Sequence, residues 1–280
     1  MTLEITNLED LRATLAGWRA KGDTIALVPT MGALHEGHLA LVAEAKRHAS
    51  KVVVSIFVNP TQFGPNEDFH RYPRPIAADL EKLRSVRADA AWLPSVETMY
   101  PNGPVSTIHI DEPITQVMDG AARPGHFDGV ATVVAALFEQ VKPDLAIFGE
   151  KDYQQLLLIK RLVNKLELNI NVIPLATQRE NDGLARSSRN AYLTENERRV
   201  APQLHAALQS AAADVRAGNS VEESISAKKG ALAAIGFAVE YLDLRDAETL
   251  AALTHYQKPA RLFVAAKLGT TRLIDNIPVE

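Results

Sequence analysis

Residues 29–38 (PTMGALHEGH) combine two histidines and two glycines directly after an apolar run. His35 and His38 are three positions apart, so in the first turn of a helix their side chains face the same way. Gly32 and Gly37 permit close approach of the backbone, and a helix N-terminus attracts anions. Two imidazoles in that setting donate hydrogen bonds to phosphate oxygens. The turn therefore predicts a phosphate site. Two solvated histidines are the alternative, and zinc is disfavoured because no third ligand lies nearby.

Lys151 stands in a second polar segment, residues 148–155 (FGEKDYQQ), which also follows an apolar run. A compact ammonium at the end of a strand suits a phosphate. It would point toward the same crevice as the histidines if the two strands are neighbours. A surface lysine paired to Glu150 or Asp152 is the alternative.

Gln62 and Gln155 follow two different predicted strands. Each side-chain amide offers donors and acceptors suited to a hydroxyl and a carboxylate. Taken singly, each glutamine is better explained as an exposed polar residue, so the residue type alone does not define a ligand.

A third polar segment, residues 177–190 (TQRENDGLARSSRN), has no hydrophobic periodicity. Ser187, Ser188 and Arg189 offer hydroxyls and a guanidinium that suit phosphate oxygens. A flexible interdomain linker is the alternative. The two interpretations are compatible, because a mobile linker can also act as a lid. With Gly183 as a hinge, we expect this segment to be mobile alone and to close over bound phosphates.

The elements that must position these residues alternate between strand-like and helix-like character over the first two thirds of the chain. Continuous apolar strands between helices are typical of a parallel sheet covered on both faces. Right-handed crossovers make such a sheet doubly wound and Rossmann-like, with ligands at the carboxyl ends of the strands. The expected strands are residues 24–29, 51–58, 88–93, 145–148 and 170–175, and the expected helices are residues 8–20, 36–49, 75–87, 129–140 and 152–166.

Beyond residue 177 the pattern changes to helices followed by strands, which predicts a smaller α+β domain. Thr194 and Glu197 have the spacing of a capping box that opens a long helix. The expected helices are residues 195–217 and 221–234, and the expected strands are residues 237–244, 261–268 and 271–276. We therefore expect a Rossmann-like ligand-binding domain over residues 1–177 and a C-terminal lid domain over residues 178–280.

The composition is that of a globular protein, with 46% hydrophobic and 23% charged residues among 280. The absence of cysteine excludes disulfides, thiolate catalysis and cysteine-ligated metals. A net charge of −4 gives no electrostatic footprint for nucleic acid. No apolar stretch reaches the roughly 18–20 residues of a membrane helix, and early acidic residues disfavour a secretory signal. We expect a cytoplasmic protein that binds neither nucleic acid nor membrane.

Several segments together resemble the pantothenate synthetase (pantoate–β-alanine ligase) family. The HEGH sequence of residues 35–38 resembles the HIGH signature of the nucleotidylyl transferase superfamily, and the SSR sequence of residues 187–189 resembles its second signature. The strings FVNPTQF, YPR, RPGHFDGV, FGEKDYQQ and DGLARSSRN resemble the family in order; they occupy residues 57–63, 72–74, 123–130, 148–155 and 182–190. The resemblance implies ATP-dependent condensation of (R)-pantoate with β-alanine through a pantoyl adenylate.

The resemblance also implies roles for individual residues. His35, His38 and Lys151 are implied as catalytic, Gln62 and Gln155 as pantoate-binding, and Gln62 also as β-alanine-binding. ATP contacts are implied for Met31, Gly32, Ala33, Leu34, His35, Glu36, Gly37, His38, Gly149, Glu150, Lys151, Asp152, Gln178, Arg186, Ser187, Ser188 and Arg189. Weaker candidates for the substrate pocket are Asn59, Arg123 and His126, with Met31, Val130 and Phe148 as its apolar wall.

Arg186 and Gln178 depart from the family pattern, which has apolar residues at both places. The resemblance further implies Mg²⁺, held mainly by the ATP phosphates with Asp79 as a neighbour. It also implies a homodimer, for which residues 51–58 or the nearby loop are the expected interface. Two other functions stay open: a nucleotidyltransferase with a phosphate acceptor such as phosphopantetheine, and a non-catalytic nucleotide-binding module.

Overall fold

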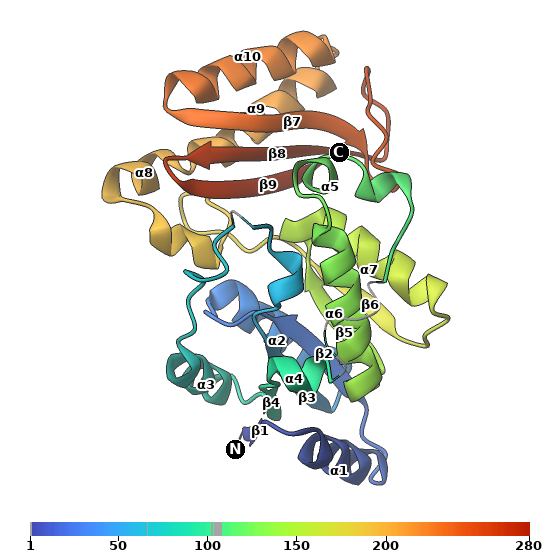
Figure 1. Ribbon diagram of the computed structural model, residues 1–280. Helices are drawn as coiled ribbons and strands as arrows, with labels where there is room; N and C mark the ends of the chain where they lie inside the picture. Colours follow the sequence, from blue (N-terminus) through green and yellow to red (C-terminus); the bar gives the residue numbers. More distant parts are fainter. Residues whose placement is uncertain (1, 66, 102, 104–107) are drawn as a thin grey trace. The chain divides into compact units, whose positions relative to one another are not determined.

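The computed structural model describes residues 2–65, 67–101, 103 and 108–280 (Figure 1). The chain divides into two compact units. The first consists of Met1–Glu150 and Gln154–Ala176, and the second of Lys151–Tyr153 and Thr177–Glu280. The division near residue 177 accompanies the change of pattern in the sequence, but the short stretch Lys151–Tyr153 belongs to the second unit.

The first unit is built on a six-stranded sheet in the order β1-β4-β3-β2-β5-β6, in which every pair is parallel. The strands are β1 (Leu3–Ile5), β2 (Ile25–Thr30), β3 (Lys51–Ile56), β4 (Ala90–Trp92), β5 (Leu145–Gly149) and β6 (Asn171–Leu175). The central strands are apolar without alternation because both faces of the sheet are covered. The predicted doubly wound α/β class is confirmed.

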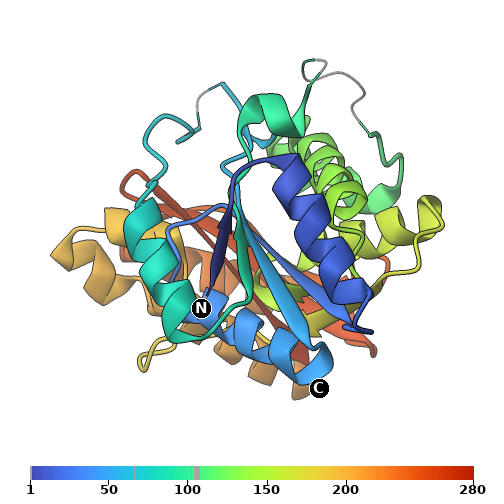
Figure 2. The same cartoon turned by 90° about the horizontal axis from the view of Figure 1, so that it is seen from below.

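Helices pack on both faces of this sheet (Figure 2). They are α1 (Leu8–Arg19), α2 (Glu36–His48), α3 (Ile76–Ser85), α4 (Val96–Met99), α5 (Asp119–Ala122), α6 (His126–Val141) and α7 (Tyr153–Lys165), with 3₁₀ turns η1 (Pro60–Gln62), η2 (Pro113–Thr115) and η3 (Glu150–Asp152). One face carries α2 and α3, whose Val42 and Leu83 share a core with Val28. The other carries α1 and α6, which contact each other.

The switch point of this doubly wound sheet lies between β2 and β5. From β2 the chain proceeds to β3 and β4 on one side, and it then returns to place β5 on the other side of β2. Strand β2 pairs with β3 along its whole length, from Ile25 to Thr30, but its pairs with β5 stop at Leu27. The carboxyl ends of β2 and β5 therefore diverge at the point where the direction of winding reverses, which is where such sheets bind ligands.

The second unit is an antiparallel sheet in the order β7-β8-β9, with α9 and α10 packed against it (Figure 1). Its elements are η4 (Ser188–Tyr192), α8 (Glu195–Val200), α9 (Gln203–Arg216), α10 (Val221–Ala234), β7 (Phe237–Asp246), β8 (Ala260–Leu268) and β9 (Thr271–Val279). Leu208, Leu242 and Leu262 are fully buried in its core. This is the predicted smaller α+β domain; its expected role as a lid stays a prediction.

Three expectations about elements need correction. The predicted helix over residues 195–217 is two helices, because Pro202 has no N–H to continue the hydrogen-bond ladder of α8. The predicted capping box of Thr194 and Glu197 does open α8. Strand β1 was not predicted; its three residues pair with β4 at the edge of the sheet and are too short to show a periodicity. Helix α6 begins at His126 rather than Gly129.

Among the described residues, the helices include none that is both long and apolar enough to cross a membrane.

Candidate active site

The turn that joins β2 to α2 is fixed by one buried carboxylate. Asp79 of α3 is fully buried, and its two oxygens accept hydrogen bonds from the backbone N–H groups of Ala33 (2.8 Å) and Leu34 (2.7 Å). Gly32 and Ala33 have φ of +82° and +49°, so the turn holds a left-handed backbone at both residues. A side chain at Gly32 would approach Ile56 and Asp79 to about 3 Å. Glycine at position 32 is therefore explained by the left-handed backbone and by the lack of space for a side chain beside Ile56 and Asp79.

His35 and His38 are oriented by the backbone at the start of α2. His35 is the N-cap residue, and its Nδ1 accepts the N–H of Gly37 at 3.1 Å. The Nδ1 of His38 accepts the N–H of His35 at 3.3 Å, and the two ring centroids lie 4.1 Å apart. Because each Nδ1 is an acceptor, each neutral ring carries its proton on Nε2. The pair therefore presents two N–H donors beside the positive end of a helix, as the spacing predicts.

Both carboxylate oxygens of Asp79 accept hydrogen bonds from the backbone of the turn, whereas the resemblance implies that Asp79 is a neighbour of Mg²⁺. Burial raises the pKa of Asp79, against the opposing effects of the Leu34 and Ala33 amides and of Lys82. Among the described residues, no group of three or more acidic or histidine side chains has the arrangement of a metal site. The residues shown here do not form a cage for Mg²⁺, and a role of Asp79 beside the metal stays a prediction.

Gln62 lies next to the turn and is held by a buried asparagine. Its Nε2 donates to Sδ of Met31 at 3.0 Å, and its Oε1 accepts from Nδ2 of Asn59 at 3.2 Å. Asn59 is 1% exposed and is itself fixed by the hydroxyl of Tyr100 (2.8 Å) and the carbonyl of Gly129 (3.1 Å). The structure thus brings together one predicted pantoate ligand and one predicted ATP contact. Asn59 acts here as an orienting residue, and Tyr100 was not predicted.

A half-buried polar cluster of Glu67, Arg123 and His126 supports the backbone of Gln62. Arg123 pairs with both carboxylate oxygens of Glu67 at 2.6 Å, and its Nη1 donates to Nε2 of His126 at 2.9 Å. Nδ1 of His126 donates to the carbonyl of Gln62 at 2.8 Å. Burial and the neighbouring guanidinium of Arg123 lower the pKa of His126 to about 4, despite the opposing effect of the Gln62 carbonyl. His126 is therefore neutral near pH 7, with its proton on Nδ1.

The adjacent glutamines Gln154 and Gln155 have different roles. Gln154 is buried, accepts the N–H of Asp119 at 3.2 Å and donates to the carbonyls of Ile114 (2.6 Å) and Val117 (2.8 Å). Gln155 is half-buried and makes no hydrogen bond to Gln62 among the described residues. Gln154 is thus engaged in hydrogen bonds within the fold, whereas no such bond is described for the side chain of Gln155.

The FGEKDYQQ segment is shared between the two units. Gly149 ends β5 and Glu150 begins η3 in the first unit, whereas Lys151 and Asp152 belong to the second. Strands β2 and β5 are neighbours, as the prediction for this segment required. Nζ of Lys151 lies 3.6 Å from a carboxylate oxygen of Asp152, and the lysine side chain is 20% exposed. Lys151, the proposed phosphate ligand, therefore forms the ion pair with Asp152 that the alternative interpretation expects.

The segment of residues 177–190 is more ordered than its polarity suggests. Residues 178–186 form a small hairpin with hydrogen bonds from Arg186 N to Gln178 O (2.9 Å) and from Glu180 N to Leu184 O (2.8 Å). Leu184 and Ala185 are each 4% exposed. The lack of hydrophobic periodicity therefore does not mean that this segment lacks hydrogen-bonded structure or buried apolar residues. Its expected closure over ATP stays a prediction.

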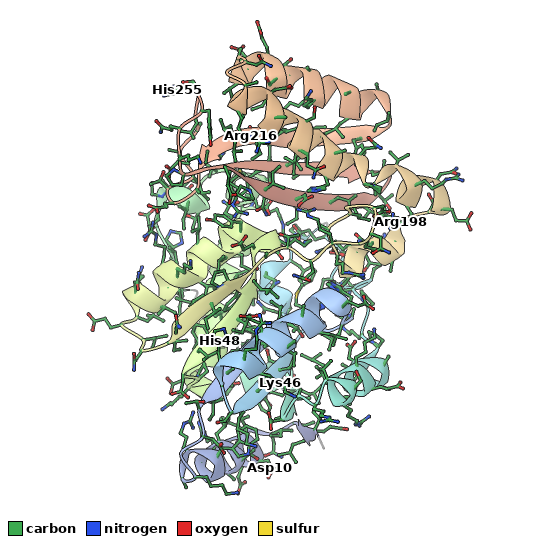
Figure 3. The ribbon with its side chains drawn as sticks, turned by 180° about the vertical axis from the view of Figure 1, so that it is seen from behind. Asp10, Lys46, His48, Arg198, Arg216 and His255 are labelled. Atoms are coloured by element: carbon green, nitrogen blue, oxygen red, sulfur yellow. The ribbon has the colours of Figure 1, made fainter. Side chains whose placement is uncertain are left out.

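Ion pairs anchor this 178–186 hairpin within the second unit. Arg179 donates to both carboxylate oxygens of Asp275 at 2.7 and 2.9 Å. Arg198 of α8, labelled in Figure 3, pairs with Glu180 (3.1 Å) and Asp182 (2.6 Å). The hydrogen bond from Arg198 lowers the pKa of Asp182, with burial acting weakly in the other direction. The predicted hinge, Gly183, has φ of +93° and packs against His205.

The predicted phosphate ligands follow the hairpin directly. Ser187 is the N-cap of η4, and its hydroxyl accepts the N–H of Arg189 at 3.3 Å. Ser188 and Arg189 are half-buried in this turn. The two departures from the family pattern, Gln178 and Arg186, stand opposite each other in the hairpin and share a backbone hydrogen bond.

Three histidines outside the turn after β2 lie close to carboxylates. His48, labelled on the last turn of α2 in Figure 3, lies 2.9 Å from Glu44, and His109 lies 2.9 Å from Asp128. His205 lies 3.4 Å from Asp275. None of these partners is close in sequence except Glu44, so spacing alone does not reveal them.

The first unit thus presents an anion-directed turn at the switch point of a parallel sheet, with the side-chain amides of Asn59 and Gln62 beside it. This combination defines a nucleotide-binding enzyme of the α/β class. The family model for pantoate–β-alanine ligase matches residues 4–278. The chain belongs to the pantoate–β-alanine ligase family.

Named relatives and solved structures agree with the family model. The chain is 53% identical over 275 residues to a pantothenate synthetase of Rhodospirillum rubrum, covering 98% of this chain and 97% of the relative. A solved pantothenate synthetase of Thermus thermophilus superposes with a TM-score of 0.94 at 45% identity, with 99% of each chain covered. A pantoate–β-alanine ligase of Francisella tularensis, solved with β,γ-ATP and β-alanine, has a TM-score of 0.86 at 34% identity; 99% of this chain and 98% of that chain are covered.

Proposed function

We propose that this chain condenses (R)-pantoate with β-alanine, driven by ATP, and releases AMP and pyrophosphate. The observation that carries the proposal is the oriented pair His35–His38 beside the β2–β5 switch point, in a chain that the family model covers almost completely. The pantoate carboxylate attacks the α-phosphorus, which gives a pantoyl adenylate. The amine of β-alanine then attacks the acyl carbon, so no protein nucleophile is required.

The histidine pair acts in the first step. Negative charge builds on the oxygens around the α-phosphorus as pyrophosphate leaves. Donors that are already oriented stabilise that charge without reorganisation at the moment of reaction. His35 and His38 meet this condition because backbone N–H groups fix both rings. Residues of the second unit, Lys151 and the 187–189 stretch, are proposed to contact the remaining phosphate oxygens.

The amides act on the acid. We assign Gln62 and Gln155 to the hydroxyl and carboxylate groups of pantoate, and Gln62 also to β-alanine. Gln62 is suited to this role because Asn59 and Met31 hold its side chain and His126 holds its carbonyl. Val130 and Phe148, 2% and 5% exposed, are largely buried, and only a small part of each side chain remains to meet the methyl groups.

Magnesium enters this scheme as part of the substrate, bound to the phosphates of ATP. Mg²⁺ keeps several waters and depends on substrate oxygens in many phosphoryl-transfer sites. That mode fits the described residues, because the nearest predicted neighbour, Asp79, already accepts two backbone N–H groups.

The remaining assignments are a homodimer in the cytoplasm that binds no nucleic acid. Both edges of strand β3 are occupied, because it pairs with β2 on one side and β4 on the other. A dimer therefore cannot form by pairing a partner strand to β3, and the loop after this strand is the more suitable part of the expected interface. Sedimentation of the purified chain measures the dimer directly.

Pyrophosphate release from ATP tests the function, with pantoate present or absent and β-alanine withheld. We expect a burst of pyrophosphate only with pantoate, and continuous AMP formation only after β-alanine is added. Release driven instead by 4′-phosphopantetheine would favour a nucleotidyltransferase with a phosphate acceptor. If neither pantoate nor 4′-phosphopantetheine causes pyrophosphate release, the result would favour a non-catalytic nucleotide-binding module.

A further inference from the structure

Strand β9 carries two adjacent buried polar residues, Asp275 and Asn276, which are 4% and 3% exposed. They interrupt an apolar strand in which Leu273 contributes to the core of the second unit. A strand packed in a protein core has no need of two polar side chains in a row. Each of them has a hydrogen-bond partner in one of the two predicted phosphate-binding segments of this unit.

Asn276 holds the backbone of Lys151. Its Nδ2 donates to the carbonyl of Lys151 at 2.8 Å, and its Oδ1 accepts from Nη1 of Arg261 on β8. Its own N–H donates to the carboxylate of Asp275 at 2.7 Å. Because the oxygen of the amide receives a guanidinium, the orientation of the amide is determined, and its nitrogen must face the Lys151 carbonyl.

Arg261 also contacts Tyr153, which lies two residues after Lys151. Its guanidinium lies 3.9 Å from the ring centroid of Tyr153, and that ring packs against Phe263 with a centroid distance of 5.9 Å. The arginine is 6% exposed, so this cation–π contact is largely removed from water. Residues 151–153 thus contact Asn276 of β9 and Arg261 of β8, which explains why this stretch belongs to the second unit.

Asp275 holds the other segment. Its carboxylate receives both terminal nitrogens of Arg179, and Arg179 in turn donates to the carbonyl of Gly183 at 3.0 Å. Burial opposes the charged form of Asp275, but His205 and Arg179 outweigh it and lower the pKa of the carboxyl. The 178–186 hairpin, which leads directly into Ser187, is therefore tied to the strand residue next to Asn276.

We propose that Asp275 and Asn276 are positioning residues that hold the Lys151 turn and the 178–186 hairpin in one fixed register on β9. The proposal rests on the proposed function, in which both segments contact the triphosphate of ATP. Neither residue is a catalytic residue; Asn276 acts through Lys151 and Asp275 through the hairpin. Together they fix the position of the Lys151 ammonium relative to residues 187–189.

A double-mutant cycle tests the first half of the proposal. Asn276→Ala and the isosteric Asn276→Asp both remove the donor to Lys151. Misplacing a charged group in this way lowers catalysis about ten- to a hundredfold. We expect either change to lower the single-turnover rate of pantoate-dependent pyrophosphate release by that factor. In a Lys151→Ala background the same changes have no further effect, because interacting residues are not additive.

Hydrogen exchange supplies a readout that does not depend on activity. Asn276→Ala is expected to raise exchange mainly in residues 151–153, and Asp275→Asn mainly in residues 178–186. Leu273→Ala is the matched control, because it removes a core side chain from the same strand that forms no hydrogen bond with either segment, although Leu184 of the hairpin belongs to the same core. It should lower the thermal midpoint and raise exchange in both segments to a similar extent.

Two results would overturn the inference. The first is additivity, with Asn276→Ala lowering the rate by the same factor with and without Lys151. The second is a pattern of exchange for Asn276→Ala and Asp275→Asn identical to that of Leu273→Ala, which would mean a general loss of stability. Failure of the proposed function looks different, since the unmodified protein would then release no pyrophosphate with pantoate.

Discussion

The two segments with signature sequences, the turn after β2 and the 178–186 hairpin with the residues that follow it, are held by different forces. The turn is fixed by short hydrogen bonds from backbone N–H groups to the fully buried carboxylate of Asp79. The hairpin is held mainly by guanidinium–carboxylate pairs, one buried at Asp275 and others near the surface at Arg198. Both segments are polar and contain glycine, so they look alike in the sequence.

The difference separates a rigid part of the site from an adaptable one. A buried carboxylate bonded to backbone amides allows a single conformation of the turn, and the left-handed residues Gly32 and Ala33 depend on it. Ion pairs between long side chains tolerate small shifts and are weakened by salt where they are exposed. We therefore place the fixed transition-state donors in the turn and the nucleotide-dependent closure in residues 187–190, which follow the hairpin.

The largest expected effect is at His38. Removing one oriented transition-state donor costs about 10²–10³ in rate. We predict that His38→Ala lowers pantoyl-adenylate formation by this factor while the thermal midpoint stays near that of the unmodified protein. His48→Ala is the control, because His48 lies at the opposite end of the same helix and pairs with Glu44. Near-normal adenylate formation by His38→Ala would remove this residue from the reaction.

Asp79 tests the rigidity of the turn. In Asp79→Asn one of the two backbone N–H groups meets an amide nitrogen instead of an oxygen. Hydrogen bonds to charged groups contribute about 1.5–3 kcal/mol, so we predict a loss of roughly 2 kcal/mol in unfolding free energy together with slower adenylation. Asp144→Asn is the matched control, because Asp144 accepts the N–H of Ile25 at the other end of β2. Its stability cost should come without a change in adenylation per folded molecule.

The adjacent glutamines separate ligand binding from folding. We predict that Gln155→Ala weakens pantoate about tenfold more than ATP, because a buried hydroxyl or carboxylate loses its partner. Gln154→Ala should instead lower the unfolding free energy by about 1–3 kcal/mol, since it leaves the Ile114 and Val117 carbonyls unpaired. Titration calorimetry with each ligand and urea unfolding measure the two effects. Equal losses of ATP and pantoate affinity would place Gln155 outside the acid pocket.

The smallest effect is expected at the surface of the hairpin. Arg198→Ala removes two partly exposed ion pairs, so we predict a change below about 1 kcal/mol in unfolding free energy. A non-hydrolysable ATP analogue should protect residues 183–190 from hydrogen exchange in this variant as in the unmodified protein. Arg189→Ala should lose most of that protection. Equal protection with and without nucleotide would show that the segment is a fixed wall and not a lid.

Much of the fold follows from local pattern. The apolar runs of β2, β3 and β5 and the capping box of Thr194 and Glu197 are visible in the sequence because their causes lie within a few residues. Pro202 shows why a long helical pattern is not one helix. The three residues of β1 gain their conformation from pairing with β4 and carry no local signal.

The site is predictable where its chemistry is contiguous. The pair His35–His38 is recognised from spacing alone, but the anchors Asp79, Glu67 and Asn276 come from distant segments. One signal was available: the adjacent Asp275 and Asn276 break the apolar pattern of a core strand. That break shows that the strand has polar partners, but it does not reveal which residues they are.

Oxygen transfer tests the central claim, that the pantoate carboxylate attacks the α-phosphorus of ATP. Pantoate labelled with ¹⁸O in both carboxylate positions is incubated with the protein, ATP, magnesium and β-alanine, and the products are weighed by mass spectrometry. The account predicts one labelled oxygen in AMP and one in the amide carbonyl of pantothenate. Label in orthophosphate or pyrophosphate, with none in AMP, would mean attack at another phosphorus and would contradict the account.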